Sequence, residues 1–502
     1  MNDPSSIERG QPTDGAWFRP AAIALLAFAL GLRLIGLGKS LWIDEAGSLS
    51  RASAQNFWAA AHADVHPPLY FLLLRVGLQL THSFALLRLF SVACGLGLVA
   101  AATFFLRRTP IAAIALGAIF AGLPELVRHS QELRPYSLLV LALGVAMLLS
   151  IRIARGEATG ATRIWLCLAA LVAAGTHVAA AFFLLALAPL LAWPELRSGA
   201  RRIAGSLAPL TAAALLLAWL ELDYLRSPAG LPEGWWIPPA TVGQVVASLG
   251  DAVGWTEVGQ FADAVSRHMP GGGALVRAVA AAAAAVGVWA AWGRRPLEPV
   301  PWLLLASGLI YMGSLIAFSW AFEPLVIGRT LLPGLLPIAA GMALGVGANP
   351  RGVVRVAAAA CITVFVLMAC ETGVRGAFVP REGLRGLAAA VRARYRPGDQ
   401  LVLFRSMDYG LAPYWEGVLD TRPLLIDQTK PIQPQLAEVR QRLGALPRPE
   451  RVLVVWRNDY YLIEHAAEVS ACLGELSASG MTAREVWRDG DLVLLEGDAQ
   501  AR

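Results

Sequence analysis

Titratable side chains are concentrated in one stretch of an otherwise apolar region, KSLWIDEAGSLSRASAQNFWAAAHADVHPPLY, which covers residues 39–70. Its 32 residues include Asp44, Glu45, His62, Asp64 and His66. Ionisable groups beside a bilayer are costly and are usually retained for function. Adjacent carboxylates suit a general base that works beside a second charge or a metal ion. The alternative is an ordinary interfacial loop in which the acids are merely solvated.

A second polar stretch, HSQELRPYSL, covers residues 129–138. Pro124 and Pro135 bracket it, which predicts that a helix stops, turns and restarts there. The side chains that surround its fixed cation are Gln131, Glu132, Arg134 and Tyr136. A guanidinium binds carboxylates and phosphates in a planar fork, so this stretch could hold an anion. The alternative is that Arg134 simply pairs with Glu132 at the membrane interface.

Three further polar residues lie at the ends of apolar segments. Arg329, in EPLVIGRTLLP, either anchors a helix to lipid headgroups or holds a lipid phosphate. Lys39 follows the first apolar segment and should lie at the same depth. His177 occupies a tight turn between two short apolar segments, where a capping role and a ligand role are equally compatible with the pattern.

Composition identifies the broad class. Of 502 residues, 56% are hydrophobic and 16% are charged, whereas soluble domains are about 25% charged. Residues 380–502 hold 33 of the 78 charged residues, so a soluble domain follows a membrane part that ends near residue 375. The net charge of +6 comes from arginines that flank the membrane, which argues against a nucleic-acid partner. The five cysteines have neither metal-ligand spacing nor a disulfide pattern.

The apolar segments predict a polytopic α-helical membrane protein with eleven spanning helices, since a span needs roughly 20 apolar residues. The predicted spans are 20–37, 84–106, 110–127, 133–151, 164–176, 178–193, 203–222, 274–293, 299–320, 330–348 and 353–371. Segment 67–82 is short and polar enough to be only half inserted. The arginine clusters then all fall on the cytoplasmic side, and the titratable stretches fall outside.

The predicted domains follow from this topology. Residues 1–375 form a transmembrane domain with a first extracytoplasmic loop, 38–67, and a lid-like loop, 223–273, that could equally be an interfacial anchor. Residues 376–502 form an extracytoplasmic α/β domain, because helical patterns alternate with short β-like runs in a partly parallel arrangement. The site should therefore lie on the outer face.

The motifs W-x-D-E after the first apolar segment, D-x-HPPLY and SQELRPYSL together resemble the GT-C glycosyltransferases. More narrowly, residues 20–350 resemble the bacterial relatives of protein O-mannosyltransferases and of the lipid A aminoarabinose transferase, in glycosyltransferase family 39. The resemblance implies a polyprenyl-phosphate sugar donor and extracytoplasmic transfer at a bacterial plasma membrane. It also implies catalysis by Asp44, with Glu45 beside it. The resemblance implies that Arg134 and Arg329 bind the donor phosphate and that His66 and Gln131 line the cavity. Lys39 should lie at the same depth as the phosphate. The other residues predicted to line the cavity are Asp64, Glu132, Tyr136 and His177.

Several alternatives stay open at the level of sequence. The simplest mechanism is a single displacement with inversion, but retention with Glu45 as nucleophile fits the same residues. A divalent metal at Asp44 and Glu45 is compatible with the acidic cluster, although an arginine-bound phosphate does not require one. The acceptor could be a glycolipid, a cell-wall glycan or a protein. A transporter or flippase of lipid-linked sugars would show internal repeats, which are absent from the pattern, and a glycan ligase with a polyprenyl-diphosphate donor would share the arginines.

Overall fold

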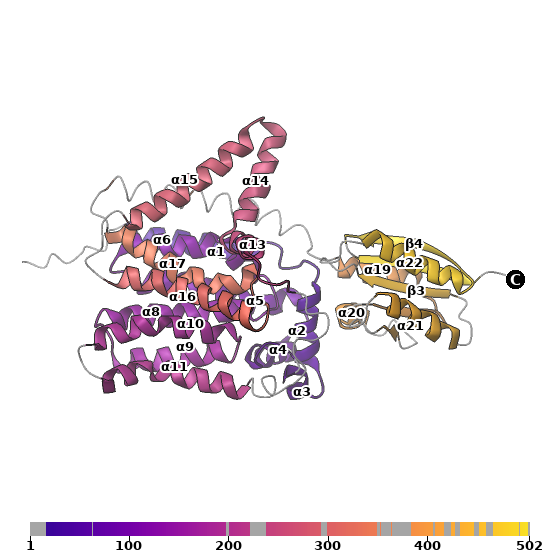
Figure 1. The fold of residues 1–502 in the computed structure, drawn as a ribbon, viewed down its shortest axis with the longest axis horizontal. Helices are drawn as coiled ribbons and strands as arrows, with labels where there is room; N and C mark the ends of the chain where they lie inside the picture. Colours follow the sequence, from indigo (N-terminus) through magenta and orange to yellow (C-terminus); the bar gives the residue numbers. More distant parts are fainter. Residues whose placement is uncertain are drawn as a thin grey trace, which may run out of the picture.

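The fold is described from a computed structural model of the chain. The described residues are 17–62, 64–196, 200–220, 237–292, 299–348, 383–404, 407–415, 423–426, 432–445, 451–457, 465–490 and 492–499, with Gly352 and Thr363. The first part is a helical bundle, and a small α/β domain lies at one end of it (Figure 1).

Ten of the eleven predicted spans coincide with helices of the bundle. These are α1 (Phe18–Leu34), α5 (Phe84–Phe105), α6 (Pro110–Gly122), α8 (Tyr136–Ala154), α9 (Gly160–Ala174), α10 (Ala179–Ala192), α11 (Ala200–Leu220), α15 (Gly272–Trp292), α16 (Val300–Ala321) and α17 (Gly328–Ala348). Within the described residues, α5, α8, α11, α16 and α17 are each long and apolar enough to cross a membrane. The chain is therefore an integral membrane protein. The predicted span 353–371 and the domain boundary near residue 375 lie outside the described residues, so the count of eleven stays a prediction.

The first predicted loop is helical and lies at the end of the bundle nearest the α/β domain (Figure 1). It contains α2 (Ile43–Ser53) and α3 (Phe57–His62), and α4 (Leu69–Leu80) follows it. With 12 residues, α4 is about 18 Å long, well short of the ~30 Å hydrocarbon core. Its length agrees with a half-inserted segment.

Pro124 divides the third predicted span into α6 and the short α7 (Pro124–His129). A proline cannot donate a backbone hydrogen bond, so the break leaves carbonyl groups of α6 without helical partners. Arg33, fully buried in α1, donates to the carbonyls of Phe120 (2.9 Å) and Ala121 (3.1 Å) and to the hydroxyl of Ser130 (3.2 Å). One side chain thus satisfies the broken helix inside the apolar bundle.

The predicted lid-like loop is largely helical where the structure describes it. Residues 221–236 lie outside the described residues. The rest forms α13 (Val242–Val253) and α14 (Trp255–His268), and α14 pairs with α15 to project from the bundle (Figure 1). Both helices have an amphipathic pattern, and Gly254, at φ +78°, makes the turn between them; whether this segment acts as a lid stays a prediction.

The C-terminal domain has a partly parallel sheet, as predicted, and the described residues form five strands of it. The strands are β1 (Gln400–Leu403), β2 (Leu424–Leu425), β3 (Arg451–Arg457), β4 (Met481–Asp489) and β5 (Leu492–Ala499), in the order β2-β1-β3-β5-β4. β1 pairs in parallel with β2 and β3, and β5 pairs antiparallel with β3 and β4. The helices are α19 (Leu384–Arg394), α20 (Met407–Trp415), α21 (Ile432–Ala445) and α22 (His465–Ala478). Sequence patterns missed β4, an edge strand whose side chains are mostly polar and partly exposed.

Candidate functional site

A cavity of about 200 Å³ lies beside the first turn of α2. Side chains from distant parts of the chain meet there: α2, the segment before α4, the start of α8, the turn between α9 and α10, and the start of α17. The predicted site residues that line the cavity are Asp44, Asp64, His66, Arg134, Tyr136, His177 and Arg329. Ile237, close to the predicted lid, also lines it.

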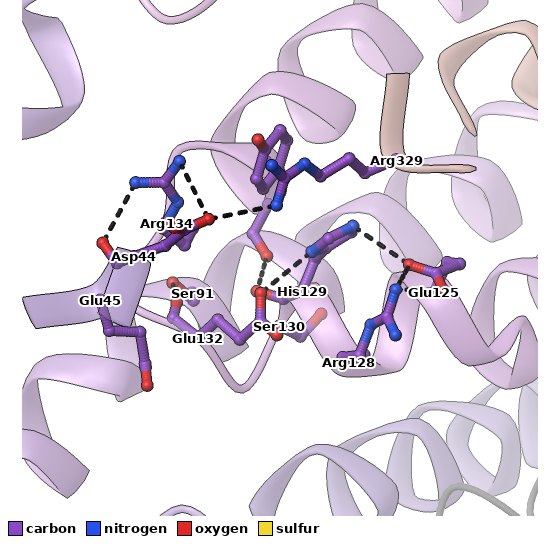
Figure 2. A network of polar contacts seen from close by, with 12 residues as sticks. Asp44, Glu45, Ser91, Glu125, Arg128, His129, Ser130, Glu132, Arg134 and Arg329 are labelled. Carbon is purple, nitrogen blue, oxygen red and sulfur yellow. Dashed lines mark hydrogen bonds and ion pairs between the residues drawn. The ribbon is translucent and has the colours of Figure 1, made fainter. Parts of the chain in front are cut away.

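The carboxylate of Asp44 lies between two guanidinium groups (Figure 2). Arg329 donates from Nη1 to Asp44 Oδ2 at 3.2 Å, and Arg134 Nη2 lies 3.8 Å from the same oxygen. Arg134 Nη1 also donates to the Asp44 backbone carbonyl and to the Ser48 hydroxyl, both at 3.1 Å. The Asp44 side chain is 29% exposed, so this carboxylate faces the cavity and can meet a ligand.

The guanidinium groups of both arginines lie over the aromatic ring of Tyr136. The guanidinium carbons of Arg134 and Arg329 lie 5.7 Å and 5.5 Å from the centre of its ring. An aromatic face attracts cations electrostatically, and the attraction is larger where water is excluded. Tyr136 is 3% exposed. The ring therefore holds two positive charges at one place although they repel each other.

The other wall of the cavity is built by Asp64, His66 and His177. His66 Nδ1 lies 2.9 Å from Asp64 Oδ1, Arg51 pairs with the second Asp64 oxygen, and the His66 and His177 rings meet edge to face at 4.7 Å. Burial alone would raise the pKa of Asp64, but His66 and the nearby arginines lower that pKa well below its usual range. Burial lowers the pKa of His66, and burial together with neighbouring positive charges lowers that of His177 further.

Glu45, the neighbour of Asp44, points away from the cavity (Figure 2). Its carboxylate forms a two-point ion pair with Arg88, at 2.9 Å and 2.7 Å, and it also accepts from the Leu133 backbone N–H at 2.8 Å. The Glu45 and Arg88 side chains are both fully buried. This carboxylate ties α2 to α5 and to the start of α8.

Three other predicted site residues do not line the cavity. Gln131 donates to the carbonyls of Leu32 (2.8 Å) and Ile35 (2.9 Å) at the end of α1. Glu132 lies 3.2 Å from His129 Nδ1, and its backbone carbonyl accepts from the Ser91 hydroxyl at 2.7 Å. Lys39 supplies its backbone carbonyl to Arg88 at 2.8 Å. These residues help to shape the loop that carries Arg134 and the connection that carries Asp44.

A metal ion does not fit the acidic pair that sequence suggested. The Asp44 carboxylate faces two guanidiniums, and the Glu45 carboxylate is chelated by a third, in Arg88. In the part of the chain that the structure describes, no group of three or more His, Cys, Asp or Glu side chains converges as metal ligands would. We derive no chemical step through a metal.

Sequence reasoning missed Ser48 and Arg51, which both line or support the cavity, and the buried partner Arg88. Ser48 and Arg51 lie one and two turns after Asp44, so the helical period of α2 places them near it. Arg88 lies inside the apolar segment 84–106, and an arginine inside a membrane segment is itself a signal of a buried partner. That signal was available in the sequence.

No protein-family model matches the chain, and no curated protein matches it by sequence. Solved structures do match. The crystal structure of ArnT from Cupriavidus metallidurans bound to undecaprenyl phosphate superposes with a TM-score of 0.56 at 14% identity, over 94% of this chain and 97% of that one. The apo structure of the same ArnT has a TM-score of 0.47 at 16% identity, over the same shares. The chain therefore has the fold of ArnT, a GT-C glycosyltransferase, over nearly its whole length.

Proposed function

We propose that this protein is a membrane glycosyltransferase that moves a sugar from a polyprenyl-phosphate donor to a hydroxyl group of an extracytoplasmic acceptor. The observation that carries the proposal is the placement of the Asp44 carboxylate against Arg134 and Arg329 in one cavity. A base next to two phosphate-binding cations is what this reaction requires, since the acceptor hydroxyl must lose a proton and the departing phosphate gains charge.

The proposed step is a single displacement. Asp44 takes the proton of the acceptor hydroxyl, whose oxygen bonds to the anomeric carbon of the sugar. The bond from that carbon to the donor phosphate oxygen breaks, and its electron pair leaves with the polyprenyl phosphate. Arg134 and Arg329 stabilise the charge that develops there. The same two arginines bind Asp44 in this structure, so a bound phosphate would draw them away and leave the carboxylate available as a base.

The fold supports the choice of donor. The matching ArnT structure holds undecaprenyl phosphate, a polyprenyl phosphate, and it matches this chain over 94% of its length. A polyprenyl tail stays in the bilayer, so its phosphate should lie near the membrane surface. The cavity lies at the N-terminal ends of α8 and α17, where these helices would meet that surface. Glu45 is buried against Arg88, and Asp64 in the cavity wall is paired with Arg51 and His66. We therefore assign the base role to Asp44, which favours inversion, and a positioning role for α2 to Glu45.

Lipid analysis tests this function directly. We expect a polyprenyl-phosphate sugar to co-purify with the wild type, to be identified by mass spectrometry, and to be consumed when an extract of the cell envelope is added. A flippase would move the same lipid across vesicles without breaking the bond between sugar and phosphate. A ligase would retain a polyprenyl-diphosphate sugar instead. Either result contradicts the proposal.

The proposed location of the α/β domain outside the cytoplasm has a separate test. Ser477, exposed on α22, is changed to cysteine, and a matched cysteine replaces Arg108, 79% exposed in an arginine-rich connection. An impermeant thiol reagent should label Ser477→Cys on intact spheroplasts and should label Arg108→Cys only after lysis. The reverse pattern overturns the topology and the extracytoplasmic site with it.

A further inference from the structure

Residues 40–43, just before Asp44, pack into the C-terminal α/β domain. The Leu41 backbone N–H donates to the Tyr414 hydroxyl at 2.7 Å, and the Ser40 hydroxyl lies 3.4 Å from that same oxygen. The Arg385 backbone N–H, in the first turn of α19, donates to Ser40 Oγ at 3.1 Å. The α/β domain thus binds the Leu41 backbone through the Tyr414 side chain and the Ser40 side chain through the first turn of α19.

Apolar side chains of the same segment also pack against the α/β domain. Trp42 and Ile43 belong to the same buried cluster as Leu384, Met407 and Leu411 of the α/β domain. Trp42 is 7% exposed and Ile43 is 5% exposed. Side chains of the first loop therefore complete a core that otherwise consists of α19, α20 and one face of the sheet.

We propose that the α/β domain is a positioning element of the transfer reaction: α20 and Tyr414 hold residues 40–43 and thereby set where the Asp44 carboxylate stands. Asp44 follows Ile43 directly and lies in the first turn of α2, so a shift of Ile43 moves it. Arg134 lies just before α8 and Arg329 lies in the first turn of α17, both in the bundle, so the domain acts on the base rather than on the donor phosphate. The inference rests on the proposed role of Asp44.

Gly410 offers a way to move Ile43 without removing any group. A Cβ at this position in α20 would lie 2.7 Å from Ile43 Cδ1, closer than carbon atoms approach. Cδ1 is the far end of the Ile43 side chain, so that side chain must move within the buried cluster that it shares with Met407 and Leu384, and only part of its movement reaches the first turn of α2. Alanine is also a better helix former than glycine, so α20 itself is not weakened. Gly474→Ala is the matched control: it lies in α22 of the same domain, and a Cβ there meets nothing within 4 Å.

We expect Gly410→Ala to lower kcat about two- to tenfold, since a misplacement of a catalytic group by about 1 Å can cost as much as about 10²-fold and the Ile43 side chain absorbs part of the displacement before it reaches Asp44. The KM for the donor and the binding of undecaprenyl phosphate should stay within about twofold of the wild type. Gly474→Ala should match the wild type in every measurement. Equal kcat values for Gly410→Ala and Gly474→Ala overturn the inference.

A second change separates displacement of Ile43 from general damage. Ile43→Val deletes the Cδ1 atom that a Cβ at residue 410 would meet. In the Gly410→Ala background it should therefore raise kcat again, although on its own a buried Ile→Val change usually lowers stability. A double variant no more active than Gly410→Ala contradicts the inference.

Tyr414→Phe provides a measurement that does not depend on the proposed function. It keeps the ring, which packs edge to face on Phe84 at 5.9 Å, and removes the hydroxyl that binds Leu41. Hydrogen exchange of a peptide that covers residues 40–49 should become faster, and kcat should fall by roughly two- to tenfold, the value of one hydrogen bond. Faster exchange with an unchanged kcat overturns the positioning role, whereas a wild type that transfers no sugar overturns the proposed function instead.

Discussion

Two neighbouring carboxylates in the first turn of α2 meet arginines in opposite ways. Asp44 faces the cavity, is 29% exposed, and shares one oxygen between two guanidiniums at 3.2 Å and 3.8 Å. Glu45 is fully buried, and Arg88 binds both of its oxygens at 2.7–2.9 Å. The Asp44 carboxylate and its two arginines stay accessible to a ligand from the cavity, whereas the Glu45–Arg88 pair is not accessible.

The difference shows how one helical turn serves both framework and chemistry. A buried ion pair whose hydrogen bonds are satisfied contributes little net stability, but removing one partner leaves an uncompensated charge. A partly exposed pair can be broken and remade as a ligand enters. Adjacent positions on a helix point about 100° apart, so Glu45 can fix α2 to the bundle while Asp44 reaches the cavity.

The largest expected effect is that of Asp44→Asn on transfer. Removal of a general base typically lowers the rate by about 10²- to 10⁴-fold, while the free energy of unfolding should change little because this side chain is partly exposed. Turnover of the donor and thermal unfolding of the purified protein check both statements. Near-normal turnover would remove Asp44 from the mechanism.

Glu45→Gln should show the opposite profile. Arg88 would keep its charge with no buried counter-charge, which typically costs about 3–5 kcal/mol of stability. The control is Glu485→Gln, which breaks an exposed pair with Arg488 in β4, where about 0–1 kcal/mol is expected. Denaturant or thermal unfolding measures both variants. Equal losses would mean that the burial of the Glu45–Arg88 pair does not determine what it contributes to stability.

Arg134→Ala and Arg329→Ala should each weaken the binding of undecaprenyl phosphate about tenfold to a hundredfold, because each removes a charged hydrogen bond worth about 1.5–3 kcal/mol. The double variant should lose less affinity for undecaprenyl phosphate than the product of the two single fold-losses, since both arginines act on one anion. Lysine should restore only part of the affinity, because the planar fork is lost.

The matched control for these variants is Arg75→Ala. Arg75 also lies over an aromatic ring, that of Phe57 at 5.5 Å, but it binds the carbonyls of Ala52 and Ala54 outside the cavity. Its donor affinity should equal that of the wild type. If all three alanine variants bind the donor equally well, the two cavity arginines are headgroup anchors and Lys39 becomes the phosphate candidate.

The smallest expected effect is the pH dependence of stability through His177. Its pKa is held well below the ordinary value of 6.5, so as pH falls through about 6.5 the unfolded chain gains a proton that the folded chain does not. The free energy of unfolding should therefore fall from pH 7 to pH 5, and His66 adds to the slope. His177→Asn can still accept the Ala179 N–H, as His177 does at 3.0 Å, and should flatten the slope. An unchanged slope in thermal unfolding across this range would contradict the assignment.

The sequence predicts the apolar helices, the partly parallel sheet and many of the polar residues that line the cavity, because these depend on local patterns. The run D-x-HPPLY brings Asp64 and His66 together within three residues, and proline fixes the turn that follows. Arg134 was found for the same reason: a proline-broken polar stretch marks a helix end. Patterns of this kind need no knowledge of what packs against them.

Tertiary partners could not be predicted in this way. Gln131 and Arg134 stand in one polar stretch, yet the first faces the end of α1 and the second faces the cavity, because the turn after α7 points them apart. The contact of Ile43 with Gly410 joins positions more than 360 residues apart in the chain. Only the three-dimensional structure shows which polar residues hold helices together and which face the cavity.

The guanidinium of Arg33 bears on the order in which the bundle assembles. It completes the hydrogen bonding of the broken α6–α7 helix from α1, a helix that leaves the ribosome about 90 residues earlier. Chains fold from the N-terminus during synthesis, so this donor is already in the bilayer when the carbonyls of Phe120 and Ala121 arrive. A chain permuted to begin after α1 would insert α6 with those carbonyls exposed to lipid, and we expect it to be cleared by membrane proteases before α1 is made.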